Sequence, residues 1–506
     1  MSAPKQTTSF WMANFEMPTF PPLKENLTAD VCIVGAGVVG LTCAYLLSKK
    51  GKKVIILDTT DNYENQTART TGHLVNILDD RYTELERLFG TESIKLIAQS
   101  HQAAVDFIKE TSSQEKINCH FENVDVYLFV PPGEPDNILD HELAAVHRAG
   151  IDAKMVDQAP LEFNTGRCVH FSHQAQFTPL EYMSGLMKAI EKNGGAIYFQ
   201  THVSNIENKS GKVHVSTENG FHVIADQAIV ATNTPINDRF IIHTKQAAYR
   251  TYVIAAKVPP GYVTKAIYYD TPDPYHYIRL AKDANGEEYI ISGGEDHRVG
   301  EDPHPEERFE CLEEWTRVRF PAMGKVKYKW SGQIYEPVDS LAFIGKNPFD
   351  ENIFIATGDS GNGLTHGTIA GILITDLVFH KKNKWKELYE PSRMSVKAIN
   401  SYLEENLNTL WQYRDWLTKG VEVSEIPPNS GAVVREGIKK VAVYCDANNK
   451  LHKLSAVCPH LGGIVRWNAV ENSWDCPCHG SRFDAFGKVI NGPAKKDLTK
   501  HEEKES

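Results

Sequence analysis

The sequence of 506 residues contains no run of about 18 apolar residues, which is the length that a helix needs to cross a membrane. Its first residues, Met1 to Gln6, have none of the apolar character of a signal peptide. Nine cysteines are scattered along the chain without the spacing of a disulfide framework, and this suits a reducing compartment. We therefore expect a cytoplasmic protein without a transmembrane segment.

An excess of positive charge is also missing. The chain has 65 acidic and 54 basic residues, which gives a formal net charge of −11 at pH 7. This charge argues against nucleic acid and against an anionic membrane surface as partners. The remaining composition, 41% hydrophobic and 24% charged, is ordinary for a globular protein, and the length predicts more than one domain.

Two short segments near the C-terminus each combine one cysteine with one histidine. Cys458 and His460 form a C-x-H pattern, and Cys476 and His479 form a C-x-x-H pattern. Two such loops can hold a [2Fe-2S] cluster with both thiolates on one iron and both imidazoles on the other. The same residues could instead bind zinc, although zinc fingers usually place two cysteines before two histidines.

The two motifs resemble the Rieske family over roughly the last 85 residues, and the resemblance implies that these four side chains are the cluster ligands. In respiratory Rieske proteins a second cysteine in the first loop forms a disulfide with the cysteine of C-P-C-H. Here that position is Gly463, which leaves Cys478 without such a partner. A tyrosine that reaches a cluster sulfur in those proteins is replaced by Phe483, while Ser481 remains able to donate. Because hydrogen bonds to cluster sulfur raise the reduction potential, we expect a potential below the respiratory type.

A dinucleotide-binding pattern opens the main body of the chain. It consists of a buried strand over 30–34, the glycines Gly35, Gly37 and Gly40, a helix over 41–50 and a strand over 53–57 that ends at Asp58. The glycines permit a tight turn, the helix N-terminus binds the pyrophosphate, and the acid accepts hydrogen bonds from the ribose hydroxyls. The pattern alone does not distinguish NAD from FAD, and a structural glycine-rich turn is the alternative.

Three later segments extend this picture. Residues 66–78 are rich in small and hydroxyl side chains directly after the second strand, which suits a loop against a cofactor. Residues 196–234 read as a β meander followed by a strand. Residues 353–378 predict a strand, a glycine-rich loop and a helix, but they lack the G-x-G-x-x-G spacing. We therefore expect one dinucleotide site in the chain.

Together these segments resemble the FAD-dependent oxidoreductases of the glycine/D-amino-acid oxidase (DAO) family over residues 28 to about 385. The segments A-R-T-T-G-H-L and G-D-S-G-N-G-L-T-H-G-T resemble more closely a bacterial subgroup in which such a flavoprotein is fused to a C-terminal Rieske domain. The resemblance implies an α/β fold, with a Rossmann-like FAD-binding domain and an antiparallel substrate-domain sheet, plus a small all-β Rieske domain.

The resemblance also implies which residues bind FAD. Gly35, Gly37, Gly40 and Asp58 would hold the ADP half, although the family usually has Glu at the last position. The remaining cofactor-binding residues would be Arg69, Thr70, Thr71, Gly72 and His73 beside the pyrophosphate and flavin, Val203 near the adenine, and Gly358, Asp359, Gly361, Asn362, Gly363, Leu364 and Thr365 along the ribityl chain and pyrimidine edge.

The domain boundaries that we expect follow from these motifs and from composition. They are an N-terminal arm over 1–29, an oxidoreductase unit over 30–385, a helical linker over 386–425, a Rieske domain over 426–500 and a tail over 501–506. Within the oxidoreductase unit, the FAD-binding parts would cover about 30–89, 151–239 and 326–385, and the substrate parts about 90–150 and 240–325.

The strands of the substrate part carry candidate catalytic residues. Tyr277 and Arg279 share a face, as do Arg250 and Tyr252, because strand residues two apart point to the same side. In the DAO family an Arg and a Tyr often hold a substrate carboxylate, which makes Tyr277, Arg279 and Arg250 candidates. The alternative is that both are solvated strand faces. His73 is a further candidate because it lies in a flavin motif.

The linker contains a helical stretch from Val396 to Leu417 with an apolar stripe. The stripe comprises Leu403, Leu407, Leu410, Trp411 and Trp416. We expect it to pack between the two domains rather than to touch a membrane or a partner.

The sequence therefore favours a flavoprotein dehydrogenase. A small amine or amino acid would be oxidised at its C–N bond with hydride transfer to FAD, and the Rieske cluster would pass single electrons to an acceptor protein or a quinone. The alternative is a reductase that takes electrons from NAD(P)H and feeds a separate oxygenase, but the single dinucleotide fingerprint is already assigned to FAD. A redox sensor without catalytic activity is a third hypothesis, and the intact flavin motifs argue against it.

Overall fold

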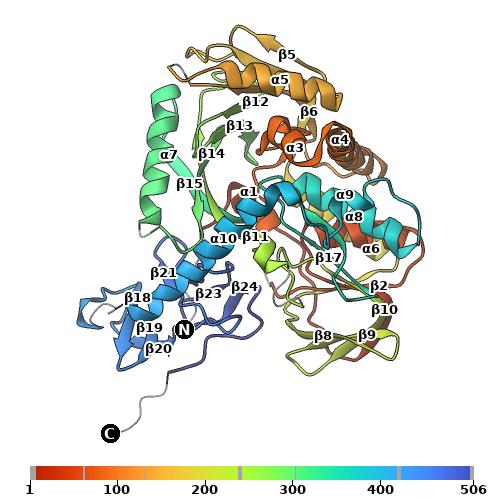
Figure 1. Cartoon of the computed structure of the whole chain (residues 1–506), viewed down its shortest axis with the longest axis vertical. Coiled ribbons are helices and arrows are strands. Elements are labelled where there is room, and N and C mark those ends of the chain that lie inside the picture. Colours follow the sequence, from red (N-terminus) through yellow and green to blue (C-terminus); the bar gives the residue numbers. More distant parts are fainter. Residues whose placement is uncertain are drawn as a thin grey trace.

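The computed structural model describes residues 7–60, 63–131, 133–237, 242–302, 304–418 and 423–501. Figure 1 shows two large sheets with their helices and, at the lower left, a smaller strand-rich unit formed by the C-terminal part of the chain. This arrangement agrees with the expected fold class, an α/β flavoprotein unit followed by a small β domain. Within the described residues, no helix combines the length and the apolar character needed to cross a membrane.

The first sheet carries the dinucleotide-binding pattern. Its strands are β1 (Leu27–Val34), β2 (Val54–Leu57), β7 (Ala196–Tyr198), β8 (Val203–Lys209), β9 (Lys212–Thr217), β10 (His222–Val230), β16 (Phe343–Lys346) and β17 (Ile353–Thr357). Strands β7, β2, β1, β10 and β17 are parallel neighbours in that order, while β16 and the β8–β9 hairpin join antiparallel. Strands β2 and β17 are buried on both faces, which explains why they read as continuous apolar runs.

Helix α2 (Val38–Lys49) follows β1, as the motif predicts, and packs against α6 (Pro179–Lys192) and α8 (Gly363–Val378). Small residues bring α2 and α8 together. A Cβ atom on Gly371 of α8 would lie only 2.3 Å from Cγ2 of Thr42 in α2. This close packing fixes the starts of both helices at the same edge of the sheet, where β1 and β17 end.

The second sheet forms the roof over the first. Its order is β15-β11-β14-β13-β12-β4-β6-β3, with β5 beside β6, and all pairs are antiparallel except β12 with β4. The strands are β3 (His73–Leu74), β4 (Glu122–Phe129), β5 (Ala153–Val156), β6 (Cys168–Gln176), β11 (Gln246–Lys257), β12 (Ile267–Asp270), β13 (His276–Lys282), β14 (Glu288–Arg298) and β15 (Val326–Pro337). Strands β3, β5, β6 and β15 thus belong to the roof, although their sequence positions fall in the segments expected to bind FAD.

Two helices pack against this roof, α5 (Asn137–Ala149) on β5 and β6, and α7 (Pro305–Arg319) on β11 and β14. Helix α4 (Thr91–Gln114) packs against both α5 and α8, and α3 (Arg81–Phe89) packs against α4 and α5. Figure 1 places α5 at the top of the molecule and α7 along the free edge near β15.

The described part of the N-terminal arm lies over the first domain. Its short helix α1 (Phe10–Asn14) buries Phe10 and Trp11. Ser9 Oγ donates to the Ala68 carbonyl at 2.6 Å, and Trp11 Nε1 donates to the Thr70 carbonyl at 2.6 Å. The arm therefore fastens the loop that follows β2.

The C-terminal unit consists of two small antiparallel sheets. The first contains β18 (Ser430–Glu436), β19 (Lys439–Cys445) and β20 (Leu451–Ser455), and the second contains β21 (Arg466–Asn468), β22 (Ser473–Asp475), β23 (Arg482–Asp484) and β24 (Val489–Asn491). Its core gathers Trp474, Phe483 and Val465 around the cysteines of the two motifs. This is the all-β domain that the sequence predicts.

The linker runs through α9 (Lys386–Tyr389), η3 (Val396–Ala398), α10 (Ile399–Gln412), η4 (Tyr413–Leu417) and η5 (Val423–Glu425). Figure 1 shows α10 crossing the front of the molecule from the flavoprotein unit to the C-terminal sheets. The expectation that its apolar stripe packs between the domains is wrong. Leu403, Leu407, Leu410 and Trp411 are 53% to 65% exposed, because α10 turns its polar side toward the protein.

Candidate functional site

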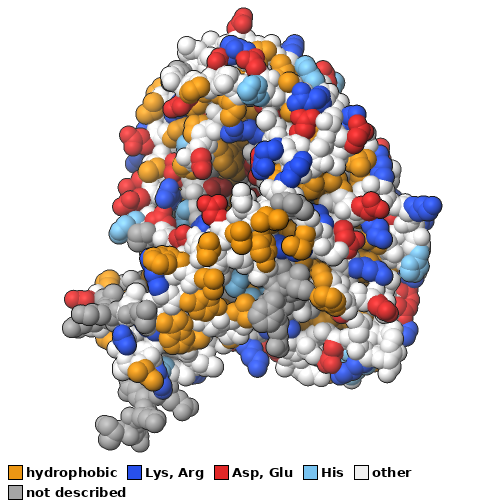
Figure 2. Space-filling model, viewed as in Figure 1, with side chains coloured by type: hydrophobic (Ala, Val, Ile, Leu, Met, Phe, Trp, Pro, Cys, Tyr) orange, Lys and Arg blue, Asp and Glu red, His pale blue; other side chains and the backbone are white. Residues whose placement is uncertain are grey.

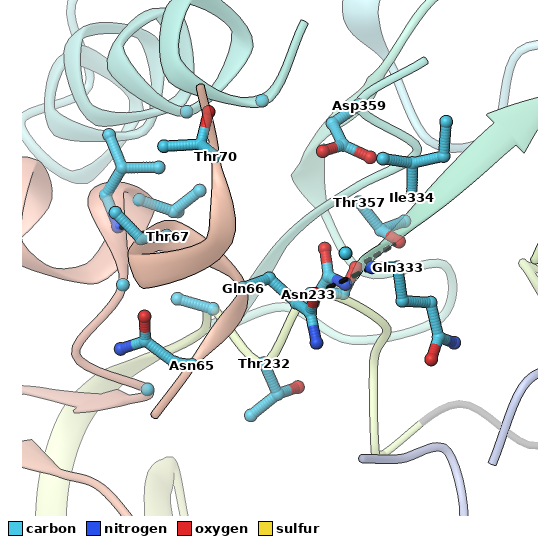
Figure 3. Close-up of a pocket in the computed structure, with 18 of the residues that line it drawn as sticks. Asn65, Gln66, Thr67, Thr70, Thr232, Asn233, Gln333, Ile334, Thr357 and Asp359 are labelled. Atoms are coloured by element: carbon cyan, nitrogen blue, oxygen red, sulfur yellow. Dashed lines mark hydrogen bonds between the residues drawn. The ribbon is translucent and has the colours of Figure 1, made fainter. Parts of the chain in front are cut away.

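A long cavity lies where the two sheets and the C-terminal domain meet. Its walls come from the β1–α2 turn, the loop after β2, residues 201–203, the end of β10, strand β15, the start of α8 and residues 489–495. In Figure 3, Asn65, Thr67 and Thr70 stand on one side of the hollow, and Gln333, Thr357 and Asp359 stand on the other. The cavity is therefore shared by both domains.

The glycine pattern shapes the first end of this cavity. Gly35 has a φ of +105°, and a Cβ there would lie 2.4 Å from the Ala231 carbonyl oxygen. A Cβ on Gly40 would lie 1.9 Å from the Gly35 carbonyl oxygen, so α2 can approach β1 only without a side chain at that position. Gly35 and Gly37 line the cavity, whereas Gly40 supports the turn from behind.

Asp58 ends β2 at the cavity wall, where the ribose-binding acid is expected. Its carboxylate accepts hydrogen bonds from the Ala36 amide at 2.6 Å and from the amide and hydroxyl of Thr60 at 2.9 and 2.8 Å. These bonds fix the carboxylate, and the oxygens keep further acceptor capacity toward the cavity. Val203 lines the same end, as expected for the adenine side.

The loop over residues 69–73 is held by its backbone carbonyls. Trp330 Nε1 donates to the Arg69 carbonyl at 2.9 Å, and Arg279 Nη1 donates to the carbonyls of Thr71 and Gly72 at 2.9 and 2.8 Å. Since the carbonyls are bound from behind, the side chains of Thr70 and Thr71 line the cavity. Gly72 itself lies against Arg279 and does not line it.

The glycine-rich segment over 358–365 forms the opposite wall at the start of α8. Asp359, Gly361, Asn362, Gly363, Leu364 and Thr365 all line the cavity, and Gly358 instead packs against Pro337. The Asp359 carboxylate accepts from the Tyr335 amide at 3.1 Å. Burial raises the pKa of this carboxyl to about 6. A helix start with small residues is suited to binding a phosphate or a flavin edge.

Three tyrosines and a histidine enclose the far end of the cavity, namely Tyr269, Tyr275, Tyr277 and His73. His73 Nδ1 lies 2.7 Å from the Tyr269 hydroxyl, and its ring meets those of Tyr269 and Tyr277 edge-on at 5.6 and 5.2 Å. Burial, together with the Arg279 charge, lowers the pKa of His73 well below its ordinary value. His73 is therefore neutral at physiological pH, and its Nε2 has no hydrogen-bond partner among the described residues.

Asp79 adds a carboxylate to this end. Tyr275 donates its hydroxyl to Asp79 Oδ2 at 3.1 Å, and the Asp79 side chain is exposed to the cavity. Enclosure by the protein and the charge of Asp80 raise the pKa of Asp79 to about 7. Sequence reasoning missed Asp79 and Tyr269, because neither lies in a glycine-rich motif or shows an informative spacing.

The two arginines expected to hold a substrate carboxylate lie elsewhere. Arg279 is 3% exposed and does not line the cavity, since its donors bind the carbonyls of the 69–73 loop. Burial lowers its pKa to about 9. Arg250 is 1% exposed, faces the C-terminal domain and donates to Ser331 Oγ at 2.6 Å. Of the four candidate catalytic residues, only Tyr277 and His73 reach the cavity.

In the two Cys–His loops, the two thiols lie close to each other, and the two imidazoles also lie close to each other. Cys458 and Cys476 are both 2% exposed, and their thiols lie within hydrogen-bonding reach of each other. The rings of His460 and His479 have centroids 5.1 Å apart. No group of three or more potential metal ligands converges on one point in the described chain, whereas a two-plus-two division is what Rieske ligation requires. The residues present fit a [2Fe-2S] cluster.

Three residues around the cluster loops bear on the comparison with respiratory Rieske proteins, namely Gly463, Phe483 and Ser481. A Cβ on Gly463 would lie 2.6 Å from Cys478 Sγ, so position 463 is where a disulfide partner would stand. Phe483 is fully buried in the same core as the cysteines. Ser481 Oγ accepts from the Ala494 amide at 3.0 Å.

The imidazole side of the cluster loops faces the flavoprotein unit. His243 of η2 (His243–Lys245) lies 4.9 Å from His460 and 6.1 Å from His479, ring centre to ring centre. Gln333 Nε2 donates to the Gly480 carbonyl at 2.8 Å, and Gln333 also lines the cavity. One side chain therefore touches both the cavity and the second cluster loop.

A buried ionic group joins the two domains beside η1 (Gln66–Arg69). Glu471 of the C-terminal domain is 3.5 Å from Arg69 and 3.9 Å from Arg250, and it accepts a hydrogen bond from Ser331. Burial opposes ionisation of Glu471, but the guanidinium groups of Arg69, Arg250 and Arg482 outweigh it and lower its pKa to about 2. Arg69, expected at the flavin, thus lines the cavity and also anchors the second domain.

Comparison with known proteins agrees with both sites. The family model of the FAD dependent oxidoreductases (DAO) matches residues 30–377, and the Rieske [2Fe-2S] domain model matches residues 417–502. The Rieske 2Fe-2S iron-sulfur protein YhfW of Bacillus subtilis is 30% identical over 498 residues, which cover 97% of this chain and 96% of that protein.

Two further relatives match the flavoprotein unit. Gamma-glutamylputrescine oxidoreductase of Escherichia coli is 25% identical over 402 residues, which cover 74% of this chain and 89% of that protein. The solved structure of glycine oxidase from Geobacillus kaustophilus shares the fold over 73% of this chain and 100% of its own, with a TM-score of 0.62 and 16% identity. The chain therefore belongs to the FAD dependent oxidoreductase (DAO) family, binds FAD, and carries a [2Fe-2S] cluster in a C-terminal Rieske domain.

Proposed function

We propose that this oxidoreductase removes electrons from the C–N bond of a small amine and passes them to its own Rieske cluster. FAD accepts electrons in pairs and a Rieske centre carries them singly, so the two groups together convert a two-electron oxidation into one-electron steps. The main support for this transfer is Gln333. Its side chain lines the cavity, and its Nε2 donates a hydrogen bond to the Gly480 carbonyl in the second cluster loop. The acceptor beyond the cluster would be a one-electron protein or a quinone.

The far end of the cavity favours an amine over an amino acid. A substrate carboxylate would need a free cationic partner, yet Arg279 and Arg250 are engaged outside the cavity, and Arg69 is paired with Glu471. The end offers instead the carboxylate of Asp79 and the rings of three tyrosines, which together suit an ammonium group. The relative named gamma-glutamylputrescine oxidoreductase supports an amine substrate, while the likeness to glycine oxidase shows the fold alone.

His73 is the residue that we propose as proton acceptor. With Nδ1 protonated and donating to Tyr269, Nε2 keeps a buried lone pair without a hydrogen-bond partner among the described residues, in a side chain that lines the cavity. Neutral imidazole at this position would accept a proton transiently from a bound ammonium, which must be neutral before its C–N bond is oxidised. Because its pKa is lowered, the imidazole would pass this proton on rather than hold it. Tyr269 would hold the ring in that orientation, and Tyr277 would pack against its edge.

His243 and Gln333 would hold the cluster loops against the flavoprotein. Thr234 Oγ1 lies 3.3 Å from His243 Nδ1 and accepts from Gln246 Nε2 at 3.3 Å, and Gln246 Oε1 accepts from Thr357 at 3.1 Å. Thr357 lines the cavity. A continuous set of contacts thus connects the cavity wall to the imidazole side of the cluster loops.

An anaerobic reduction experiment tests the proposal. Purified protein is mixed with diamines and monoamines. For each amine, the amino acid that differs from it only by an additional carboxylate is tested as well. NADH and NADPH are tested separately. Absorption follows the flavin, and electron paramagnetic resonance follows the reduced cluster. Bleaching by an amine, followed by the cluster signal, would support the proposal. Bleaching only by a nicotinamide would overturn it in favour of a reductase.

A further inference from the structure

Helix α10 is amphipathic in the reverse of the usual sense. Its inward side is polar: Asn406 Nδ2 donates to the Thr244 carbonyl at 3.0 Å, and Glu405 accepts from Arg298 at 2.5 Å. Gln412, at the end of the helix, is buried. A surface helix ordinarily turns its apolar side toward the protein. Helix α10 instead contacts the protein through its polar side, and its apolar side therefore faces outward.

The outward side forms a continuous apolar surface, which we call the α10 stripe. Its members are Met394, Ile399, Leu403, Leu407, Leu410, Trp411 and Trp416, exposed by 37% to 74%. Residues 399, 403, 407 and 410 recur at helical spacing and share one face. Figure 2 shows this surface as a band of hydrophobic side chains across the middle of the molecule.

The concentration of apolar surface here is unusual for this molecule. Of the large hydrophobic side chains that are exposed in the described chain, most belong to the stripe. The others are Phe349 and Ile438 in turns, Val318 on α7 and Leu451 on β20. The exposed fractions of the stripe residues together equal about four fully exposed residues, which is on the order of 800 Å² at about 200 Å² for each. A monomer's largest apolar patch is typically about 300–600 Å².

This area matches what one subunit contributes to a stable dimer, which is about 800 Å² in a standard interface. The stripe residues themselves are uncharged. Two charged residues are exposed beside them, since Glu404 stands at the edge of the stripe and Arg414 lies over the Trp411 ring at 4.6 Å. A two-fold axis would set one stripe against another, and an uncharged apolar surface is complementary to itself.

A membrane surface fits the stripe less well. Helices that lie in a membrane interface usually carry Lys and Arg on their polar side, whereas the polar side of α10 is turned into the protein and binds it through Glu405 and Asn406. The net charge of −11 also opposes approach to anionic lipid. We propose that the α10 stripe is the contact surface between two copies of this chain.

The contact would lie next to the cluster. Directly after α10, the Tyr413 hydroxyl donates to the Leu461 carbonyl at 2.7 Å, and Trp416 Nε1 donates to the Gly462 carbonyl at 3.1 Å. These carbonyls belong to the loop between Cys458 and Gly463. The second copy would therefore cover the segment that braces the first cluster loop.

The test is the mass of the full-length holoprotein in solution, measured by sedimentation equilibrium. We expect twice the chain mass of 56.7 kDa for the wild type. Leu403→Glu with Leu407→Glu places four carboxylates in the symmetric contact and should raise the dimer dissociation constant by on the order of 100-fold or more. Phe349→Glu with Ile438→Glu changes two hydrophobic side chains away from the stripe that are even more exposed, at 95% and 87%, and should leave the dimer intact.

Two further measurements keep the result decisive. Flavin and cluster absorbance report whether the double variant is folded, and Leu407→Cys in an otherwise intact chain should cross-link to its partner with a short bismaleimide. A monomeric wild type at high micromolar concentration would overturn the proposal, as would a folded double variant that stays dimeric. A monomer that instead sediments with phosphatidylcholine vesicles, and loses this when the stripe carries glutamates, would assign the stripe to a membrane.

Discussion

Replacing Glu471 by Gln removes the negative charge at the centre of the contact between the two domains. The carboxylate is fully buried between Arg69 and Arg250, at 3.5 and 3.9 Å. The fall of its pKa from an ordinary 4.5 to about 2 corresponds to roughly 3 kcal/mol of stabilisation. Gln would leave both guanidinium groups without this counter-charge, and breaking a buried pair costs about 3–5 kcal/mol. We therefore expect a loss of about 3 kcal/mol.

The assay is denaturant unfolding at pH 7, followed by circular dichroism and flavin release. The control is Glu310→Gln, which removes a charge from an exposed position on α7. The pKa of Glu471 is depressed in the folded protein, so its stabilisation is present above pH 4.5 and is lost as the pH falls toward 2. The difference between wild type and variant should shrink across that range. Equal unfolding midpoints for Glu471→Gln and the control, or a stability difference that grows on acidification, would show that the Glu471 carboxylate does not stabilise the domain contact.

Three further substitutions test the amine-binding end of the cavity, the geometry of the cluster loops and the reduction potential of the cluster. Asp79→Asn should raise the KM for an amine at least tenfold with a smaller effect on kcat, and amine binding to the wild type should weaken below about pH 7, where the Asp79 carboxyl becomes protonated. An unchanged KM would remove Asp79 from the substrate site. Gly463→Cys places two Cβ atoms about 3.4 Å apart and should form a disulfide with Cys478. Thiol titration of the denatured chain would then count eight free thiols, against nine in the wild type. Ten would contradict the geometry. Finally, we expect the cluster potential to lie below the respiratory Rieske type, and Phe483→Tyr to raise it by roughly 60 mV, the equivalent of about 1.4 kcal/mol for one electron. A titration that finds the wild type at the top of the Rieske range would contradict this.

Features encoded in short stretches of sequence could be predicted. The turn from Gly35 to Gly40 requires residues without a Cβ atom, because a Cβ would clash with neighbouring backbone atoms. The glycines of the motif therefore predict the turn directly. The Cys–His loops likewise carry their ligands at fixed local spacing. In both cases the structure places these residues as the motifs imply.

Features that depend on distant partners could not be predicted. Arg250 and Arg279 have the strand spacing of substrate ligands, but their partners, Ser331 and the 69–73 loop, lie far away in the sequence. The role of Asp79 depends on its hydrogen bond with Tyr275, which is distant in the sequence, so sequence patterns could not indicate it. The stripe of α10 showed a clear helical period, yet periodicity says only that one side is apolar and does not say which side faces the protein.

In the proposed function, the cluster receives electrons from the flavin within one molecule. This transfer can be tested without knowing the substrate, by photoreducing the flavin anaerobically in the holoprotein and recording the cluster signal by electron paramagnetic resonance after rapid freezing. We expect the cluster to become reduced after the flavin, at a rate that does not change on dilution. A cluster that stays oxidised, or a rate proportional to protein concentration, would contradict it.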